Sequence, residues 1–390
     1  MGARKGGVYI RGVMSAGLFA IYSFGGEVEL YPLLYYGLKA MSNRGDVASA
    51  YILKGGAVRK VDIDLSTEGE RSVTGEAAVG CVYVEECCKE VGWGTLCKFG
   101  PEDPAPGDRP AHTAYVALTR EGLLYIYRPP NFWHLAVGAH GFDFLIAATE
   151  SSTIEVLGGE LRRSLDGGEL LKVWKYGVES TGQSQRGPLC ALDYIYASRL
   201  DSKIDGVEVA EVRSRLAAAL AARVKADVDI VVGVPETGVY YASWLARWLG
   251  RWCFPAFVAT ARGRSALLDE VKERLAVIQL KANVVESVVR EKRVLVVDDS
   301  LISGLTIRQI SQLLRGKAGV TEVHVAVASP PLRQRCPYGV KMPPESHMVY
   351  NHLEERQMPP ALEVDSLTYL DVREVKKAVG REVCALCFYR

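Results

Sequence analysis

One run of residues, Arg293 to Ile310 (RVLVVDDSLISGLTIRQI), restricts the fold more than any other part of the sequence. An apolar, β-branched strand leads directly into two acids, Asp298 and Asp299, then into a loop of small residues and a helix. Such a unit is typical of parallel α/β sheets, where ligands bind beyond the carboxyl ends of the strands. Backbone N–H groups of the loop suit a phosphate, and the acids suit ribose hydroxyls. The same residues can also simply end a strand and cap a helix, so the pattern alone leaves both interpretations open.

Strands and helices alternate on both sides of this run. The pattern predicts helices at 207–224, 240–250, 266–280 and 305–316, and strands at 227–235, 253–259, 292–300 and 320–329. This order indicates a doubly wound α/β sheet from about residue 205 onward. Short strands are expected in the first 175 residues, at 8–14, 47–55, 77–84, 113–119, 122–128 and 144–149, with one helix at 30–45. The N-terminal half therefore reads as an α+β fold with a large sheet component.

Composition excludes several classes of protein. Lys and Arg number 47 against 46 Asp and Glu, so binding to nucleic acid through a large basic surface is not indicated. Hydrophobic residues make up 48% of the chain, which argues against disorder. No apolar run approaches the roughly 18 residues of a membrane span. The N-terminus reads as mature protein rather than as a signal peptide, and a cytoplasmic location is expected.

Nine cysteines need a separate explanation. Their odd number in a long chain without an evident export signal makes a disulfide framework unexpected. Asn and Gln are scarce, which favours a thermophilic source, and a hot organism could keep a cytosolic disulfide, so that alternative stays open. Cys384 and Cys387 form a CxxC motif at the C-terminal end. A zinc or iron–sulfur site would need two further thiolates.

Several motifs together resemble one family. VVDDSxxxGxT resembles the phosphoribosyl pyrophosphate (PRPP) signature of type I phosphoribosyltransferases, and more closely the VDDSIVRGTT motif of the glutamine PRPP amidotransferases. CALDYIYASRLDSKIDG (190–206) is similar to that family's CxFEYxYFARPDSxIDG, and VGVPETG (232–238) to its VPDSG loop. ASPPLRQRCPYGVKMP (328–343) and EVDSLTYL (363–370) match later segments. This resemblance covers nearly the whole C-terminal half.

The resemblance implies a site for PRPP and Mg²⁺. Asp298 and Asp299 would hold the ribose and the metal. A set of small loop residues would cradle the 5-phosphate, and these are Ser300, Ser303, Gly304, Leu305 and Thr306. The pyrophosphate would meet Glu236, Thr237 and Gly238, with Arg264 and Lys281 closing over it. The chain departs from the family at Ser303, where the family has Arg, and at Leu305, where it has Thr.

The resemblance also selects four cysteines for a [4Fe–4S] cluster. In the family's iron–sulfur branch the ligands occupy positions that correspond here to Cys190, Cys336, Cys384 and Cys387. Zinc and plain buried thiols remain the alternatives. The remaining cysteines match nothing in the family and are interpreted as core residues; they are Cys81, Cys87, Cys88, Cys97 and Cys253.

The N-terminal half resembles the family's glutaminase domain, an N-terminal-nucleophile fold that begins CGIFGI. Here the matching run is AGLFAI, so Ala16 stands where the nucleophilic cysteine would be. Glutamine hydrolysis needs an activated thiol, its own free amino group and oxyanion donors. The family's HNGN motif has no counterpart either. We therefore expect an inactive glutaminase, in which Arg44 and Asp46 are structural remnants.

Three segments are predicted: a degenerate glutaminase-like domain at 1–178, a phosphoribosyltransferase domain at 179–345, and a helical C-terminal tail at 346–390 that carries the CxxC motif. The resemblance implies transfer of ammonia to PRPP, with release of pyrophosphate, in purine biosynthesis. A homo-oligomer is expected, with a partner enzyme as a further option. The competing hypothesis is a non-catalytic PRPP-binding protein that regulates or scaffolds a partner.

Overall fold

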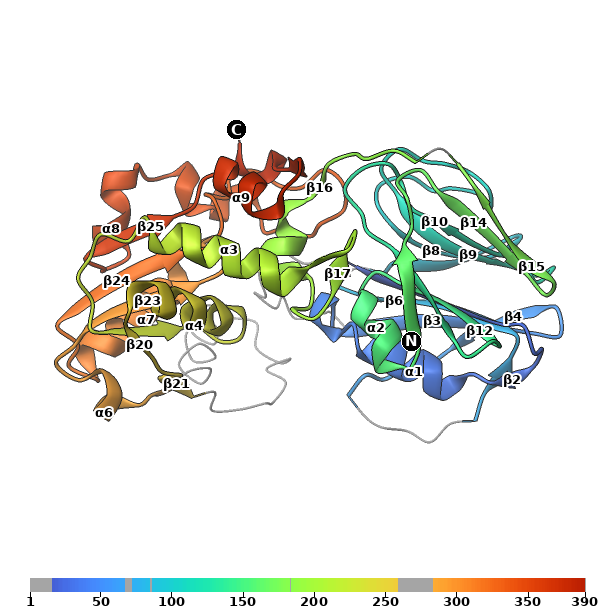
Figure 1. The fold of residues 1–390 in the computed structure, drawn as a ribbon, viewed down its shortest axis with the longest axis horizontal. Helices are drawn as coiled ribbons and strands as arrows, with labels where there is room; N and C mark the ends of the chain where they lie inside the picture. Colours follow the sequence, from blue (N-terminus) through green and yellow to red (C-terminus); the bar gives the residue numbers. More distant parts are fainter. Residues whose placement is uncertain (1–15, 67–71, 85, 183, 259–282, 390) are drawn as a thin grey trace.

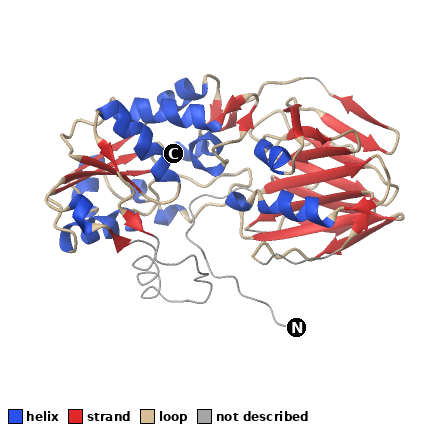
Figure 2. Cartoon of the chain, turned by 60° about the horizontal axis from the view of Figure 1, so that its bottom comes forward, coloured by secondary structure: helices blue, strands red, loops and turns tan. Residues whose placement is uncertain are grey.

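The computed structural model describes residues 16–66, 72–84, 86–182, 184–258 and 283–389. They form two lobes, one on each side of Figure 1. Strands dominate the N-terminal lobe, whereas most of the helix lies in the C-terminal lobe (Figure 2). Among the described helices, none is long and apolar enough to cross a membrane.

A seven-stranded antiparallel sheet forms one layer of the N-terminal lobe. In spatial order its strands are β13 (Glu160–Ser164), β11 (Ala136–His140), β12 (Phe144–Ala148), β1 (Gly17–Ser23), β6 (Ala77–Tyr83), β3 (Val47–Lys54) and β4 (Ala57–Val61). Helices α1 (Tyr31–Lys39) and α2 (Ser151–Val156) cover one face, where Phe19 and Ile21 pack against Leu34 and Leu38. The alternation of β1 sends its other side chains, Leu18 among them, to the opposite face.

A six-stranded antiparallel sheet packs on that opposite face. Its order is β15 (Gly177–Thr181), β14 (Leu170–Trp174), β10 (Leu124–Tyr127), β9 (Ala114–Thr119), β8 (Gly94–Phe99) and β7 (Cys88–Val91). Val116 and Leu118 of β9 meet Val79 of β6 in the core between the two sheets. The short pair β2 (Val28–Glu29) and β5 (Thr74–Gly75) lies beside the sandwich. The predicted strands at 47–55, 77–84, 113–119, 122–128 and 144–149 are confirmed, and the run 8–14 lies outside the described residues.

Five parallel strands form the C-terminal sheet, as the alternation predicts. Their order is β20 (Trp252–Cys253), β19 (Ile230–Gly233), β23 (Arg293–Asp298), β24 (Glu322–Val327) and β25 (Ser366–Tyr369). Helices α3 (Val209–Ala221) and α4 (Thr237–Leu249) pack on the face that carries Leu295 and Val297. On the other face, Val294 and Val296 meet α7 (Leu305–Gly316) and α8 (Met358–Ala361).

The structure adds detail to three sequence-based expectations. The single strand expected at 253–259 is two separate short strands, β20 and β21 (Phe257–Val258), because Pro255 lies between them and has no N–H for a sheet. The boundary expected at residue 178 falls inside β15. The C-terminal tail contains α9 (Val372–Val379), as expected, and it also supplies β25 to the sheet. The helix predicted at 266–280 lies outside the described residues.

Short elements complete the lobe and its junction with the sandwich. They are β16 (Leu189–Cys190), a π-helix (Asp193–Ala197), β17 (Lys203–Ile204), β18 (Val207–Glu208), β22 (Asn283–Val284), α6 (Glu286–Val289) and β26 (Val383–Cys384). Five isolated 3-10 turns are found at Ser42–Arg44, Glu345–His347, Val349–Asn351, Glu355–Gln357 and Leu386–Phe388. One apolar core runs from the sandwich through the π-helix to α3, so the two lobes share buried surface.

The four cysteines at 81, 87, 88 and 97 correct another expectation. They are buried, as core residues would be, but they are paired in disulfides, Cys81 with Cys87 and Cys88 with Cys97. Spacing alone does not show that β6, β7 and β8 converge here. Cys253 remains a free, partly buried thiol, as expected for a residue in a packing role.

Candidate active site at the end of the parallel sheet

The predicted acid pair lies at the carboxyl end of β23, the central strand of the parallel sheet. Val294 to Val297 are fully buried because helices cover both faces of the sheet. The backbone carbonyls of Asp298 and Asp299 accept hydrogen bonds from the N–H groups of Ala328 and Ser329, which follow β24. The two acids are therefore held firmly at the edge where ligands of parallel sheets bind.

The two acids are partly buried and adjacent to each other. Burial raises the pKa of both Asp298 and Asp299, and their mutual repulsion raises the pKa of Asp298 further. Hydrogen bonds from Ser300 Oγ, at 2.7 Å, and from Thr237 counteract this rise at Asp299, as does the nearby charge of Arg213. The pair is thus poised to favour a cation or hydroxyl donors that would relieve the repulsion.

The loop after the acids ends in a helix N-terminus. Gly304 has φ +76°, and a Cβ there would approach Leu362 Cδ2 to 2.4 Å, so the position requires glycine. The helix α7 makes its first backbone bond from Arg308 N–H to the Gly304 carbonyl. Among the earlier N–H groups, that of Leu305 donates a long hydrogen bond to Ser303 Oγ at 3.4 Å. The first turn of a helix, where N–H groups have no partner within the helix, is a place where anions bind. The side chains of Leu305 and Thr306 are exposed in this turn.

A second predicted loop, between β19 and α4, lies against the first. Glu236 is the last residue of this loop, Thr237 and Gly238 are the first two residues of α4, and the peptide bond from Pro235 to Glu236 is cis. A Cβ at Gly238 would come within 2.4 Å of the Val297 carbonyl oxygen. Together with the Thr237–Asp299 hydrogen bond, this contact joins the two sequence motifs in one site.

The tight approach at Gly238 leads to a matched test. We expect Gly238→Ala to separate the two loops. Overpacking should lower the free energy of unfolding by about 1–3 kcal/mol. The loss of PRPP binding free energy should be at least as large as this loss of stability. Gly316→Ala is the control because a Cβ there meets nothing within 4 Å. The control should be neutral or stabilising by up to about 1 kcal/mol. Calorimetric titration and urea unfolding of both variants provide the measurement, and equal behaviour would contradict the close-approach argument.

The two basic residues assigned to a closing flap, Arg264 and Lys281, lie outside the described residues. Every other predicted PRPP ligand is at the same edge of the sheet. Sequence reasoning missed Arg213, which is buried on α3 and donates hydrogen bonds to the carbonyls of Tyr194 (2.9 Å) and Ser198 (2.7 Å). Helical spacing alone does not distinguish it from a surface arginine.

The four cysteines selected by the resemblance gather from three segments. Register pairs Cys190 of β16 with Cys384 of β26, and the Cys387 carbonyl accepts the N–H group of Arg333, three residues before Cys336. All four are free thiols. Burial raises the pKa of each, and the neighbouring sulfurs raise the pKa of Cys190 and Cys387 further.

This donor set fits an iron–sulfur cluster. Thiolates are the ligands that such clusters use, and the N–H group of Tyr338 donates to Cys336 Sγ at 3.4 Å, a bond that stabilises a thiolate. Within the described part of the chain, only Cys81, Cys88 and Cys97 have ligand atoms that all lie within 4.8 Å of one another. The sulfur atoms of Cys190, Cys336, Cys384 and Cys387 are therefore spaced more widely than the ligands of a single ion would be.

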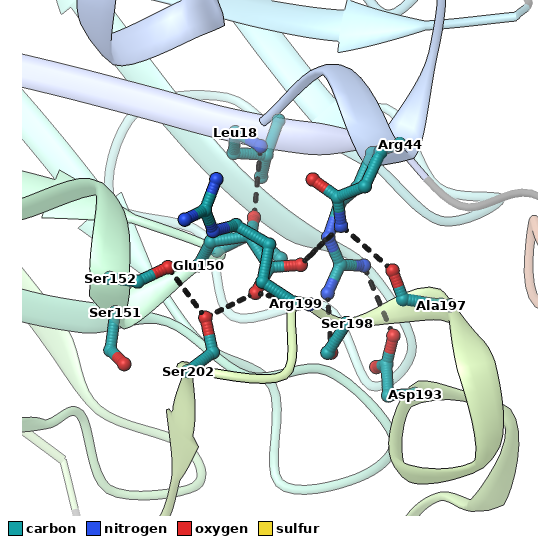
Figure 3. A network of polar contacts seen from close by, with 12 residues as sticks. Leu18, Arg44, Glu150, Ser151, Ser152, Asp193, Ala197, Ser198, Arg199 and Ser202 are labelled. Atoms are coloured by element: carbon teal, nitrogen blue, oxygen red, sulfur yellow. Dashed lines mark hydrogen bonds and ion pairs between the residues drawn. The ribbon is translucent and has the colours of Figure 1, made fainter. Parts of the chain in front are cut away.

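Ala16 lies directly before β1. A Cβ on the following residue, Gly17, would lie 3.2 Å from Arg44 Cδ. Arg44 belongs to a polar network that also includes Glu150 and Asp193 (Figure 3). Arg44 is 2% exposed and pairs with Glu150 at 2.7 Å and with Asp193 at 3.0 Å. Burial alone would lower the pKa of Arg44, but the two carboxylates outweigh it and raise the pKa.

The network joins the two lobes. Glu150 comes from the sandwich and also accepts hydrogen bonds from Asn43, Arg199 and Ser202. Arg44 donates to Ser198 Oγ at 2.8 Å. Three segments that are far apart in the sequence, around residues 44, 150 and 198, thus meet at one place. The expectation that Arg44 is structural agrees with these contacts, whereas the roles of Glu150 and Ser202 were not anticipated.

Comparisons with known proteins agree with this geometry. Residues 207–341 match the phosphoribosyl transferase domain family. Amidophosphoribosyltransferase from Bacillus subtilis is 30% identical over 285 residues, which cover 70% of this chain and 60% of that protein. The same-named protein from Methanocaldococcus jannaschii is 29% identical over 291 residues, or 70% and 61% of the two chains. This chain thus spans about 60% of the length of these relatives in the alignments.

A solved structure shares the fold over almost the entire chain. The glutamine PRPP amidotransferase from B. subtilis, determined with ADP and GMP, superposes with a TM-score of 0.82 and 24% identity, covering 95% of this chain and 96% of that one. The predicted fold class is therefore confirmed: an N-terminal-nucleophile-type sandwich is followed by a type I phosphoribosyltransferase domain.

Proposed function

Because the chain is homologous to the amidophosphoribosyltransferases, we propose that it binds PRPP with Mg²⁺ and transfers ammonia to it. The products would be 5-phosphoribosylamine and pyrophosphate. The observation that carries this proposal is the meeting of two loops, Asp298–Thr306 and Glu236–Gly238, at the carboxyl edge of the parallel sheet. Each loop supplies groups for a different part of PRPP.

The chain's own residues would position the substrate. The first-turn N–H groups of α7 neutralise the 5-phosphate, and Asp298 and Asp299 accept hydrogen bonds from the ribose hydroxyls. Backbone and side-chain groups of Thr237 and Gly238 face the pyrophosphate. Mg²⁺ would be held with help from the acid pair, and it supplies charge neutralisation on the phosphates when bound.

The reaction is a substitution at C1 of the ribose. The C1–O bond breaks and its electron pair leaves with pyrophosphate, while the nitrogen of ammonia forms a bond to C1 and then loses a proton. Catalysis of this kind rests on positioning and on the neutralisation of charge. The acid pair stabilises the positive charge that develops on the ribose.

Ammonia, rather than glutamine, is the proposed nitrogen donor. Ala16 has no thiol, so the sandwich lacks the group that attacks a glutamine amide in the related glutaminases. The residue after Ala16, Gly17, lies against the side chain of Arg44, which is paired with Glu150. Free ammonia, or ammonia delivered by a partner, would take the place of glutamine.

Titration of Mg²⁺ and PRPP into the full chain tests the binding step. We expect a single site per chain, and competition by pyrophosphate. No heat of binding at any Mg²⁺ concentration would overturn the proposal. A control titration with ribose 5-phosphate shows how much of the affinity comes from the 5-phosphate cradle alone.

We further propose a [4Fe–4S] cluster on Cys190, Cys336, Cys384 and Cys387. The support is the convergence of four free thiols, two buried and two partly buried, at a spacing wider than that for a single ion. The cluster would have a structural role, since it would tie β26 and the 333–336 segment to the π-helix region. It would supply no step of the transfer reaction.

The cluster predicts a visible loss of iron in a cysteine variant. Anaerobically purified chain should be brown, with roughly four irons per chain. Cys384→Ser should remove most of the colour and iron, whereas Cys253→Ser, a free cysteine outside the set, should retain both. Iron analysis and absorption spectra give the measurement. Equal iron in the two variants would show that Cys384 is not a ligand.

A non-catalytic role is the second candidate. The observation that favours it is Leu305, whose apolar side chain is 49% exposed where the related motif has a threonine. Ser303 likewise stands in place of an arginine that would add a positive charge. A chain that binds PRPP without turnover would then regulate or scaffold a partner.

A further inference from the structure

A second group of cysteines lies in the sandwich, far along the sequence from the C-terminal set. This N-terminal cysteine cluster consists of Cys81 on β6, Cys87 in the following connection, Cys88 on β7 and Cys97 on β8. All four side chains are buried in the core between the two sheets, with exposures from 0% to 9%. The cluster therefore connects the seven-stranded sheet to the edge of the six-stranded one.

The four sulfurs form one group rather than two separate bridges. Cys81 is bonded to Cys87 and Cys88 to Cys97. In addition, Cys88 Sγ lies 3.2 Å from Cys81 Sγ, across the two bridges. The Sγ atoms of Cys81, Cys88 and Cys97 all lie within 4.8 Å of one another. Cys87 Sγ is bonded to Cys81 Sγ and so adjoins this group of three sulfurs, without lying within 4.8 Å of every one of them.

The strand register explains this convergence. Cys88 and Cys97 are direct cross-strand partners in the β7–β8 pair, so their side chains share one face. On the other sheet, Cys81 lies opposite Leu18, and its side chain points into the same core. The adjacent residues Cys87 and Cys88 reach different partners within a single site, because the chain turns between the sheets at this point.

The dimensions suit one tetrahedral ion. With Zn–S bonds of ~2.3 Å, the sulfurs of a tetrathiolate site lie ~3.8 Å apart. In the disulfide form, the non-bonded Sγ atoms of Cys81 and Cys88 are 3.2 Å apart, and the Sγ atoms of Cys81, Cys88 and Cys97 all lie within 4.8 Å of one another. A cubane iron–sulfur cluster would hold its cysteine sulfurs much further apart. Four thiolates and no other donor type also match the usual structural zinc site, which is closed to water.

We propose that the reduced N-terminal cysteine cluster binds one Zn²⁺ through Cys81, Cys87, Cys88 and Cys97. From the disulfide form, a dithiol reductant supplies four electrons and four protons, which break two S–S bonds and give four thiols. Zinc then displaces the four thiol protons and forms four Zn–S bonds. The site is structural and independent of the proposed transferase reaction.

The zinc site would stabilise the sandwich where β6 packs against β7 and β8. A bound ion fixes three strands from two sheets at one point, and its binding free energy adds to the stability of the folded state. The site requires a reducing environment, whereas the same four residues make two disulfides in an oxidising one. Both states hold β6 against the β7–β8 pair.

Metal analysis of two matched variants tests the proposal. The full chain is prepared anaerobically with a dithiol reductant, stripped with a chelator, and reloaded with Zn²⁺. The Cys81→Ser/Cys97→Ser double variant should bind about one zinc per chain less than Cys253→Ser, whatever the C-terminal set binds. Equal zinc in the two variants would overturn the proposal.

A second measurement uses the unaltered chain, so that misfolding of a variant cannot obscure the result. Added Co²⁺ should give the visible bands of a tetrahedral tetrathiolate, and Zn²⁺ should remove them. Added Zn²⁺ should also protect the four cysteines of residues 81–97 from an alkylating reagent, as located by mass spectrometry. Rapid alkylation of these cysteines in the presence of Zn²⁺, or disulfides that survive the dithiol, would contradict the proposal.

Discussion

Replacing Arg44 by alanine is expected to destabilise the chain by about 3–5 kcal/mol, because Glu150 and Asp193 would be left as buried charges without a partner. Glu150 is fully buried and Asp193 nearly so. Burial already raises the pKa of Asp193, and the charge of Arg44 limits that rise. The loss of stability should affect both lobes, since the network includes residues of each.

A surface pair provides the matched control. Arg162 pairs with Glu160 at 2.9 Å, but their side chains are 57% and 70% exposed. Arg162→Ala should therefore cost no more than about 1 kcal/mol. Urea unfolding, followed by fluorescence and circular dichroism, measures both variants. Similar midpoints for the two would show that the Arg44 network contributes little to the lobe junction.

The largest effect on ligand binding is expected from Asp298→Asn/Asp299→Asn. Each acid accepts hydrogen bonds that are worth roughly 1.5–3 kcal/mol when the acceptor is ionised. Losing both should weaken PRPP binding tens-fold to hundreds-fold. Calorimetric titration of the double variant beside the unaltered chain measures this change. Asp227→Asn is the control. Asp227 precedes β19 at the amino end of the parallel strands, opposite the acid pair, and its side chain is 63% exposed in its pair with Arg293.

The same double variant should not lose stability. The pKa of both acids is raised in the folded chain, so their ionised forms oppose folding at neutral pH, and this cost disappears as the pH falls through the folded pKa values. Asparagine removes the charge without changing the size of the side chain. We therefore expect urea midpoints at neutral pH equal to or above that of the unaltered chain. A clear drop would mean that the acids have a structural role.

Much of the C-terminal lobe could be predicted because its signals are local. The run Val294–Val297 is apolar throughout, as only a strand covered on both faces can be, and the acids after it mark the ligand edge. Gly304 indicates the turn that leads into α7. The joining of this loop to Gly238 could be inferred only from the resemblance, since the two are separated by the whole of α4 and its following segment.

Contacts between distant segments were harder to predict. Nothing in the spacing of Cys81, Cys87, Cys88 and Cys97 shows that two sheets bring them to a single point. The same holds for Arg44, whose partners lie more than a hundred residues away. A buried arginine cannot be told from an exposed one by local pattern, because its burial depends on carboxylates that the fold supplies.

The most direct test of the proposed function is pyrophosphate release from PRPP with an ammonium salt and with glutamine, run side by side on the full chain with its iron and zinc contents known. We expect release with ammonium, none above background with glutamine, and loss of the ammonium-dependent release in the Asp298→Asn/Asp299→Asn variant. Glutamate formation with glutamine would contradict the loss of glutaminase. Absence of release with either donor, despite PRPP binding, would contradict the transferase and support the regulatory alternative.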